Sequence, residues 1–157
     1  MRIRNILLLH VYGILGFLLL MKMFSVWHED TRWRVPIRWA VVVVLIFWVV
    51  AKVFIEPISQ PPSYTESAFG LLAGMVALVT LVHSIRLSIV GVFQDIRSWT
   101  SIGVLINNVG NLPLYALSTK IVVLPTSQWM AVWSLHWLIS IIVNMCFMTA
   151  FLCIRRH

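Results

Sequence analysis

The chain has 157 residues, of which 61% are apolar and 11% are charged, and its formal net charge is +7. An ordinary soluble domain is about 45–50% apolar and about 25% charged. A domain this small exposes much of its surface, and so few charges cannot cover it. The composition therefore excludes a soluble enzyme and a disordered regulator, and it indicates an integral membrane protein. Because the basic residues flank apolar runs, we expect a lipid bilayer as the partner and no nucleic acid.

Four apolar runs are long enough to cross a bilayer as helices, which takes about 20 residues each. They cover residues 6–27, 39–55, 68–93 and 129–154. The first run follows a basic start that imitates a signal peptide, but no small-residue cleavage site comes after it, so we expect an uncleaved span. Residues 28–38 predict a short charged loop between the first two spans. We expect the third span to continue past Arg86 to about Phe93.

The segment 98–124 is harder to assign. It is uncharged from Ser98 to Thr119, but three asparagines, Gly110 and Pro113 lie in its middle; the asparagines are Asn107, Asn108 and Asn111. Amides at the centre of a bilayer are costly unless they are paired. The segment is therefore a fifth crossing, a re-entrant segment packed inside the protein, or an interfacial stretch. The predicted fold class is an all-α integral membrane protein with one domain over residues 1–157, a bundle of four transmembrane helices plus a polar fifth or re-entrant segment.

The distribution of Lys and Arg favours five crossings with the N-terminus outside. This arrangement places eight basic residues on the cytoplasmic side: Lys22, Arg32, Arg34, Arg38, Arg86, Arg97, Arg155 and Arg156. A four-span arrangement with the N-terminus inside places five there: Arg2, Arg4, Lys52, Arg155 and Arg156. The basic N-terminus argues for the second arrangement.

Small residues recur along the third span in alternating steps of three and four, the spacing of one helix face. They are Ser67, Gly70, Gly74, Ala77, Ser84, Ser88 and Gly91, with Leu81 as the one large member of the series. In lipid, helices associate by close backbone approach, and Gly70 and Gly74 form a GxxxG motif. The stripe therefore predicts tight helix packing, either within one protomer or between copies.

The last span carries a second stripe, which is polar and aromatic. Its members share one side at helical spacing: Trp133, His136, Trp137, Ser140 and Asn144. This polar face is predicted either to make hydrogen bonds between helices or to line a water path, together with Thr80, His83 and Ser84.

Histidines raise one further alternative. In the five-crossing arrangement His10 and His136 lie at similar depth, and two such histidines can hold a b-type haem between their rings. A lone membrane histidine also satisfies a neighbouring helix or carbonyl, and this reading needs no cofactor. Lys52 and Glu56 form an i,i+4 pair that we interpret as an interfacial ion pair. No metal-ligand spacing and no nucleophile–base pair occurs in the sequence, so we expect no metal site and no enzyme.

Residues 1–97 resemble small phage holins with three spans. The shared features are a very short N-terminal tail, a span, a basic loop with Arg32, Arg34 and Arg38, a second span, a charge-poor loop with prolines, and a third span. The basic end Arg155-Arg156-His157 is also similar, whereas residues 98–157 depart from the three-span pattern. The resemblance implies accumulation in the bacterial inner membrane, self-association, and lesions that release or activate a cell-wall-degrading enzyme.

Two functions are therefore expected. The first is a non-enzymatic inner-membrane protein that self-associates through small-residue helix faces and permeabilises the membrane as holins do. The alternative is a non-catalytic anchor or accessory subunit of a larger membrane complex, with a b-type haem held by His10 and His136.

Overall fold

The protein is built of long helices. In a computed structural model, the structure describes residues 3–28, 31–59, 62–87, 91–116 and 125–154. The elements are α1 (Ile3–Trp27), α2 (Thr31–Phe54), α3 (Tyr64–Leu87), a short 3-10 turn (Val92–Gln94), α4 (Ile96–Ala116) and α6 (Thr126–Ile154). Four of them, α1, α2, α3 and α6, are long and apolar enough to cross a membrane. The predicted all-α, multi-pass membrane architecture is confirmed.

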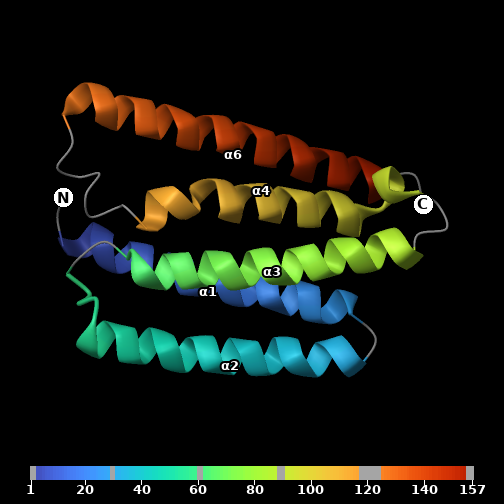
Figure 1. The fold of residues 1–157 in the computed structure, drawn as a ribbon, viewed down its shortest axis with the longest axis horizontal. Coiled ribbons are helices and arrows are strands. Elements are labelled where there is room, and N and C mark those ends of the chain that lie inside the picture. The colour runs from blue at the N-terminus through green and yellow to red at the C-terminus, as the bar shows by residue number, and fades with distance from the viewer. Residues whose placement is uncertain (1–2, 29–30, 60–61, 88–90, 117–124, 155–157) are drawn as a thin grey trace.

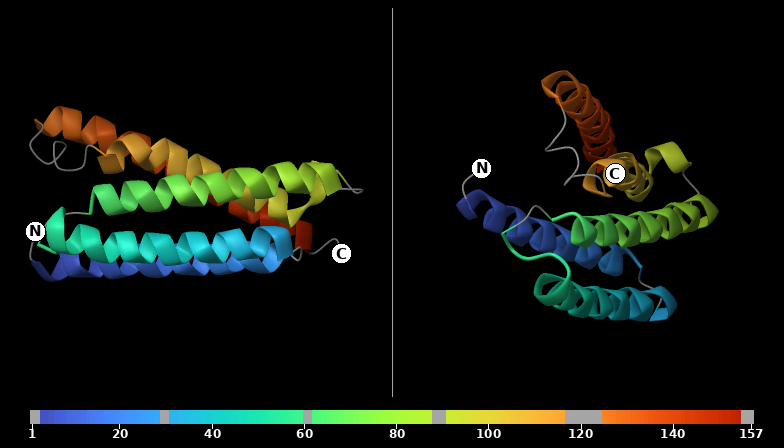
Figure 2. Two further views of the ribbon diagram at one scale, coloured as in Figure 1. Left: turned by 60° about the horizontal axis from the view of Figure 1, so that its bottom comes forward. Right: turned by 60° about the vertical axis from the view of Figure 1, so that its left-hand side comes forward.

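The helices run alternately in opposite directions, with α3 in the middle of the molecule (Figure 1). On one side of α3 lie α1 and α2, and on the other side lie α4 and then α6, as both views in Figure 2 also show. Because α3 and α6 run in the same direction, α4 carries the chain back along the bundle between them. At 1.5 Å per residue the 21 residues of α4 span about 31 Å, which matches a bilayer core.

The fifth segment forms one continuous helix, α4, over its described part. The helix runs to Ala116, with Pro113 inside its last turn. Such a proline removes only one bond near the helix end. The described part of the segment is therefore long enough to cross a bilayer, while residues 117–124 lie outside the described residues.

Two boundaries differ from the sequence prediction. The charged loop predicted over 28–38 is wrong for most of its length, because α2 already begins at Thr31. Long basic side chains such as Arg34 can sit on a helix end and reach the headgroups, so charge did not mark a loop there. Pro36 lies in the second turn of α2, where it interrupts the backbone ladder close to its start.

The predicted continuation of the third span to Phe93 is also wrong, because α3 ends at Leu87. Gly91 has a φ of +97°, which residues with a side chain rarely adopt, and the chain turns there. Asp95 then starts α4, since its Oδ1 accepts a hydrogen bond from the Arg97 N–H at 3.0 Å. Ser88 lies outside the described residues, and Gly91 lies beyond the helix that was to carry the small-residue stripe.

The apolar core lies where α1, α2, α3 and α4 meet. Its buried members are Phe17, Met21, Phe24, Ile37, Phe69, Ala73, Val76, Ala77 and Val104. Phe17 of α1 stacks on Phe69 of α3 with ring centroids 4.7 Å apart. This core fixes the first three helices against one another and against one face of α4.

In contrast, α6 contributes no buried member of this core, although its half-buried Phe147 packs against it. It packs along α4 and makes no other extensive contact with a helix among the described elements. Its remaining surface is apolar and exposed, for example at Leu138, Ile141 and Met145. Such a surface suits lipid or another helix.

Candidate functional site

The candidate site is a set of polar side chains on α4 and α6 that the bundle covers. Ser98, Ser101 and Asn111 of α4 have no exposed surface, and Asn107 and Asn108 are half-buried. Together with the half-buried His136 of α6, these residues are called the polar seam below. Because Ser98 and Asn111 are 13 residues apart, the seam extends over about 20 Å of the helix.

One hydrogen bond joins the two helices of the seam. His136 Nδ1 lies 2.8 Å from Asn111 Oδ1, and Asn111 Nδ2 donates to Asn107 Oδ1 at 3.1 Å. An amide oxygen can only accept, so His136 Nδ1 carries the proton in this bond. Asn108 is satisfied within its own helix, since its Nδ2 donates to the Val104 carbonyl at 2.8 Å. Of the two alternatives for the polar stripe, hydrogen bonding between helices therefore describes His136.

The other residues of the predicted polar face make no hydrogen bond with the described residues of α4. Trp137 and Asn144 are exposed, and the Ser140 hydroxyl donates to the His136 carbonyl of its own helix at 2.9 Å. Trp133 lies edge-on to the His136 ring, with centroids 5.4 Å apart. The stripe thus straddles the border between the covered and the uncovered sides of α6.

Two glycines of α4 let α6 approach closely, and the sequence interpretation missed them. A Cβ added to Gly103 would lie 2.9 Å from Phe147 Cε1 and 3.3 Å from Cys146 Cβ, both on α6. One added to Gly110 would lie 3.0 Å from Ile139 Cδ1. Gly103 and Gly110 are seven residues apart and hence on one helix face, a spacing that could have revealed them.

The small-residue stripe of α3 is covered by α4 of the same chain. A Cβ on Gly70 would lie 3.4 Å from Asn108 Oδ1, and one on Gly74 would lie 3.9 Å from Val109 Cγ2. Ala77 and Ser84 are also buried, and Ser67 is half-buried. Of the two alternatives for the stripe, these contacts favour packing within one protomer.

At the end of the bundle where α3 begins, Lys52 and Glu56 form a buried ion pair. Their side chains are 5% and 4% exposed, and Lys52 Nζ lies 2.7 Å from Glu56 Oε2. Thr65 donates to the same carboxylate oxygen at 2.8 Å, while the backbone N–H groups of Ser63 and Tyr64 donate to Oε1. The carboxylate therefore caps the start of α3, where the helix dipole favours a negative charge.

The Glu56 carboxylate is held ionised by these donors. Burial alone raises the pKa of Glu56, but the hydrogen bonds from Lys52, Ser63 and Thr65 outweigh it, and the pKa lies below its ordinary value. The Ser63 hydroxyl donates to the Tyr115 carbonyl at 2.7 Å, which ties this corner to the end of α4. The predicted ion pair is present, and it is buried against the start of α3.

A second carboxylate, Glu66, lies ten residues after Glu56. Glu66 packs against Gly13 of α1, where any Cβ would overlap the carboxylate. The contact explains why α1 has a glycine at this point, with α3 close beside it. Glu66 is in the first turn of α3, so its charge also complements the helix dipole.

At the opposite end of the bundle, histidines of α1 and α3 come together. His28 Nε2 lies 2.9 Å from Thr80 Oγ1, whose own hydroxyl donates to the Val76 carbonyl at 2.8 Å. His28 and His83 have ring centroids 5.4 Å apart. Thr80 and His83, which were expected to join the polar face of α6, thus face α1.

The structure does not bring the two candidate haem ligands together. His10 is buried in α1 and His136 contacts α4, and α3 and α4 lie between their helices (Figure 1). Among the described residues, no group of three or more His, Cys, Asp or Glu side chains could hold a metal ion. A haem bridging these two rings therefore has no support from this geometry.

The fold and the seam define an all-α, multi-pass membrane protein whose most polar helix is enclosed by its apolar neighbours. Neither a family model, nor a curated protein, nor a solved structure matches the chain.

Proposed function

We propose that this protein is a non-enzymatic membrane protein that self-associates and opens a polar path across the bilayer, as the resemblance to holins implies. The observation that carries the proposal is the polar seam. Amides and hydroxyls follow α4 through the bundle, and α3 and α6 of the same chain cover them. Such a helix cannot face lipid, because each unpaired polar group in hydrocarbon costs free energy. The arrangement fits a closed state in which the polar surface is covered by neighbouring helices.

The hydroxyls of the seam support this interpretation. Ser98 Oγ and Ser101 Oγ are buried and have no hydrogen-bond partner among the described residues. Groups that served stability alone would be paired or replaced by apolar ones. Water entering the seam would satisfy both hydroxyls.

The contacts of α6 indicate how the seam could open. Because α6 packs extensively on α4 alone and only its Phe147 packs against the core, it can separate as one helix while the buried residues of α1, α2 and α3 stay together. Its outward face is already apolar. After separation, the seam must face water or the seam of another copy, and a ring of copies provides both.

Self-association is assigned to the outward face of α6. Asn144 is exposed on this mostly apolar face and makes no hydrogen bond with another described residue. A hydrogen bond between membrane helices contributes about 0.6 kcal/mol and up to about 1.7 kcal/mol. A second copy that supplies this bond covers Asn144. The face of Gly70 and Gly74 is not used, because α4 occupies it.

Inducible expression with a membrane-potential dye tests the proposal. Wild-type protein should collapse the potential once it accumulates, and Asn107→Leu/Asn111→Leu should delay or abolish the collapse at equal membrane levels. Ser134→Ala is the matched control, because Ser134 is exposed on α6 outside the seam. If cells keep their potential at high levels of wild-type protein, the proposal fails.

The second candidate function is that of a non-catalytic subunit in a larger complex. The exposed Asn144 amide supports this candidate as well. A helix of a different protein could cover this amide instead of a second copy. Crosslinking in native membranes separates the two: copies of this chain crosslinked near Asn144 support self-association, and another protein at fixed stoichiometry supports the subunit.

A further inference from the structure

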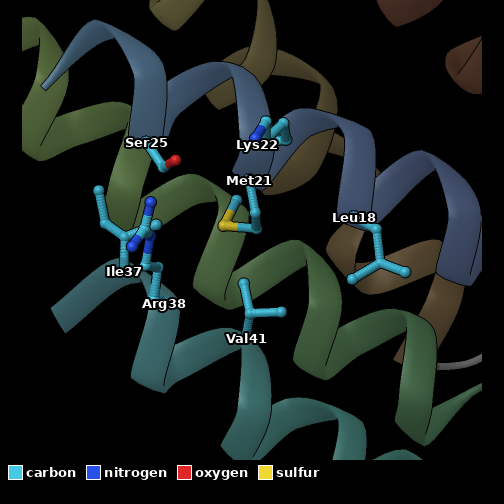
Figure 3. Close-up of a pocket in the computed structure, with 7 residues that line it drawn as sticks. All are labelled: Leu18, Met21, Lys22, Ser25, Ile37, Arg38 and Val41. Carbon is cyan, nitrogen blue, oxygen red and sulfur yellow. The ribbon is translucent and has the colours of Figure 1, made fainter. Parts of the chain in front are cut away.

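A cavity lies between α1 and α2, at the end of the bundle where α1 ends. Its volume is about 230 Å³, and its walls are Leu18, Met21, Lys22, Ser25, Ile37, Arg38 and Val41 (Figure 3). Lys22 and Ser25 come from α1, and the Arg38 side chain extends from α2 toward Ser25 (Figure 3). The cavity therefore has a cationic, hydroxyl-bearing end, whereas Leu18 and Val41 line an apolar end.

Among the described residues, no carboxylate neutralises the positive charge of this cavity. No carboxylate of the described residues forms an ion pair with Lys22 or Arg38. One turn before Arg38, the buried Nε of Arg34 also has no hydrogen-bond partner in the described part of the chain. Three cations on neighbouring turns repel one another, and an anion between the two helices would relieve the repulsion.

The position of the cavity identifies the kind of anion. Both helices face the membrane, and Leu18 lies seven residues from Ser25, about 10 Å deeper along α1. A ligand that fills the cavity must be charged at one end and apolar at the other. The volume is below the roughly 300–1,000 Å³ of sites that enclose a whole drug-sized molecule. It therefore accommodates a headgroup whose chains remain in the bilayer.

We propose that this cavity binds the phosphate of an anionic phospholipid. Lys22 and Arg38 pair with the phosphate oxygens, and the Ser25 hydroxyl donates to one of them. The upper part of an acyl chain follows Leu18 and Val41. Basic pockets between transmembrane helices on the cytoplasmic side recognise such headgroups, and most basic residues of the described ranges lie toward this end. The inference does not depend on the pore proposed above.

Native mass spectrometry of the full chain in an uncharged detergent measures this binding. We expect phosphatidylglycerol to bind at least about 10-fold more tightly than phosphatidylcholine, because charge-assisted hydrogen bonds are the strong ones. Lys22→Gln/Arg38→Gln should abolish this preference. Arg86→Gln is the matched control, since Arg86 is an exposed cation on α3 near the same end, outside the cavity, and it should leave the preference unchanged.

A second variant separates a shaped site from a charged surface. Val41→Phe fills the apolar end and leaves both cations in place, so it should lower phosphatidylglycerol binding at least about 5-fold while the helical circular dichroism is kept. The proposal is overturned if wild type shows no preference, if Arg86→Gln weakens binding as much as the double variant, or if Val41→Phe binds like wild type. Competition by millimolar inorganic phosphate would also overturn it, because the site would then take a free anion.

Discussion

His136 Nδ1 lies 2.8 Å from Asn111 Oδ1, and this bond is the polar link between α6 and α4. It pairs two side chains that would each be costly in hydrocarbon. The bond lies in the N-terminal half of α6. In the C-terminal half, Cys146 packs closely on Gly103 of α4. The α4–α6 interface is thus held by one polar contact and by glycine packing, and each can be tested separately.

Replacing Asn111 with Leu should weaken the bundle. The substitution keeps the branched shape and the number of heavy atoms of the side chain but leaves His136 Nδ1 and Asn107 without their partner, so we expect a loss of about 1 kcal/mol in the free energy of unfolding. Thermal unfolding in detergent, followed by circular dichroism, measures it. Asn144→Leu serves as the control for helix α6 and should not destabilise the isolated protomer; equal losses in both variants would contradict the assigned bond.

Gly110→Ala should lower the free energy of unfolding, whereas Gly16→Ala should raise it. Alanine favours a helix by up to about 1 kcal/mol over glycine, and a Cβ at Gly16 meets nothing within 4 Å. At Gly110 the same Cβ presses on Ile139, and overpacking costs about 1–3 kcal/mol. The difference in unfolding free energy between the two variants should therefore be about 1–3 kcal/mol. No difference would mean that α6 does not lie close to α4.

Gly74→Ile should act on folding and not on assembly. The larger side chain would push Val109 and separate α3 from α4, so we expect a loss of at least about 1 kcal/mol in unfolding free energy. The distribution of oligomers among the folded molecules should stay that of wild type, as measured by crosslinking followed by size-exclusion chromatography. A stable protomer that has lost its oligomers would restore the GxxxG face as the contact between copies.

Stability should fall in acid because of Glu56. The pKa of this carboxyl is lowered in the folded state. Its contribution to the free energy of unfolding is therefore fully present above the ordinary pKa of 4.5 and is lost as the pH falls through the lower pKa of the folded state. Thermal unfolding midpoints between pH 7 and pH 3 test this. Glu56→Gln should unfold more easily at pH 7 and should show a smaller decline toward pH 3; an unchanged decline would assign the acid sensitivity to another group.

The apolar runs predicted four of the helices, because a bilayer leaves a long apolar segment no other way to satisfy its backbone. Boundaries were less predictable, and both errors have local causes. Charge on Arg32 and Arg34 suggested a loop, although basic side chains can extend from a helix end. The turn at Gly91 was not predicted, because the pattern of apolar residues does not indicate a positive φ.

The candidate site was predicted only in part. The asparagines of α4 correctly marked a segment that needs cover, but spacing along one chain does not say which helices provide it. The stripe on α3 was predicted, and its contacts with Asn108 and Val109 of α4 favour packing within one protomer. The contacts of Gly103 and Gly110 with α6 were not predicted, because Gly110 beside the asparagines indicated an interruption of the segment and Gly103 alone indicated no helix face.

The central claim is that α6 must separate from α4 for the membrane to become permeable, and a reversible crosslink tests it most directly. A Cβ at position 103 would lie 3.3 Å from Cys146 Cβ, close to the roughly 3.5–4.5 Å of a disulfide, so Gly103→Cys should bond to the native Cys146. The variant is reconstituted into dye-loaded liposomes, with Gly103→Cys/Cys146→Ser as the control that cannot form the bond.

Oxidised Gly103→Cys should leave the dye inside, and added reductant should release it at the rate of the control. Dye release at equal rates before and after reduction, with the crosslink shown to be complete, would contradict the account.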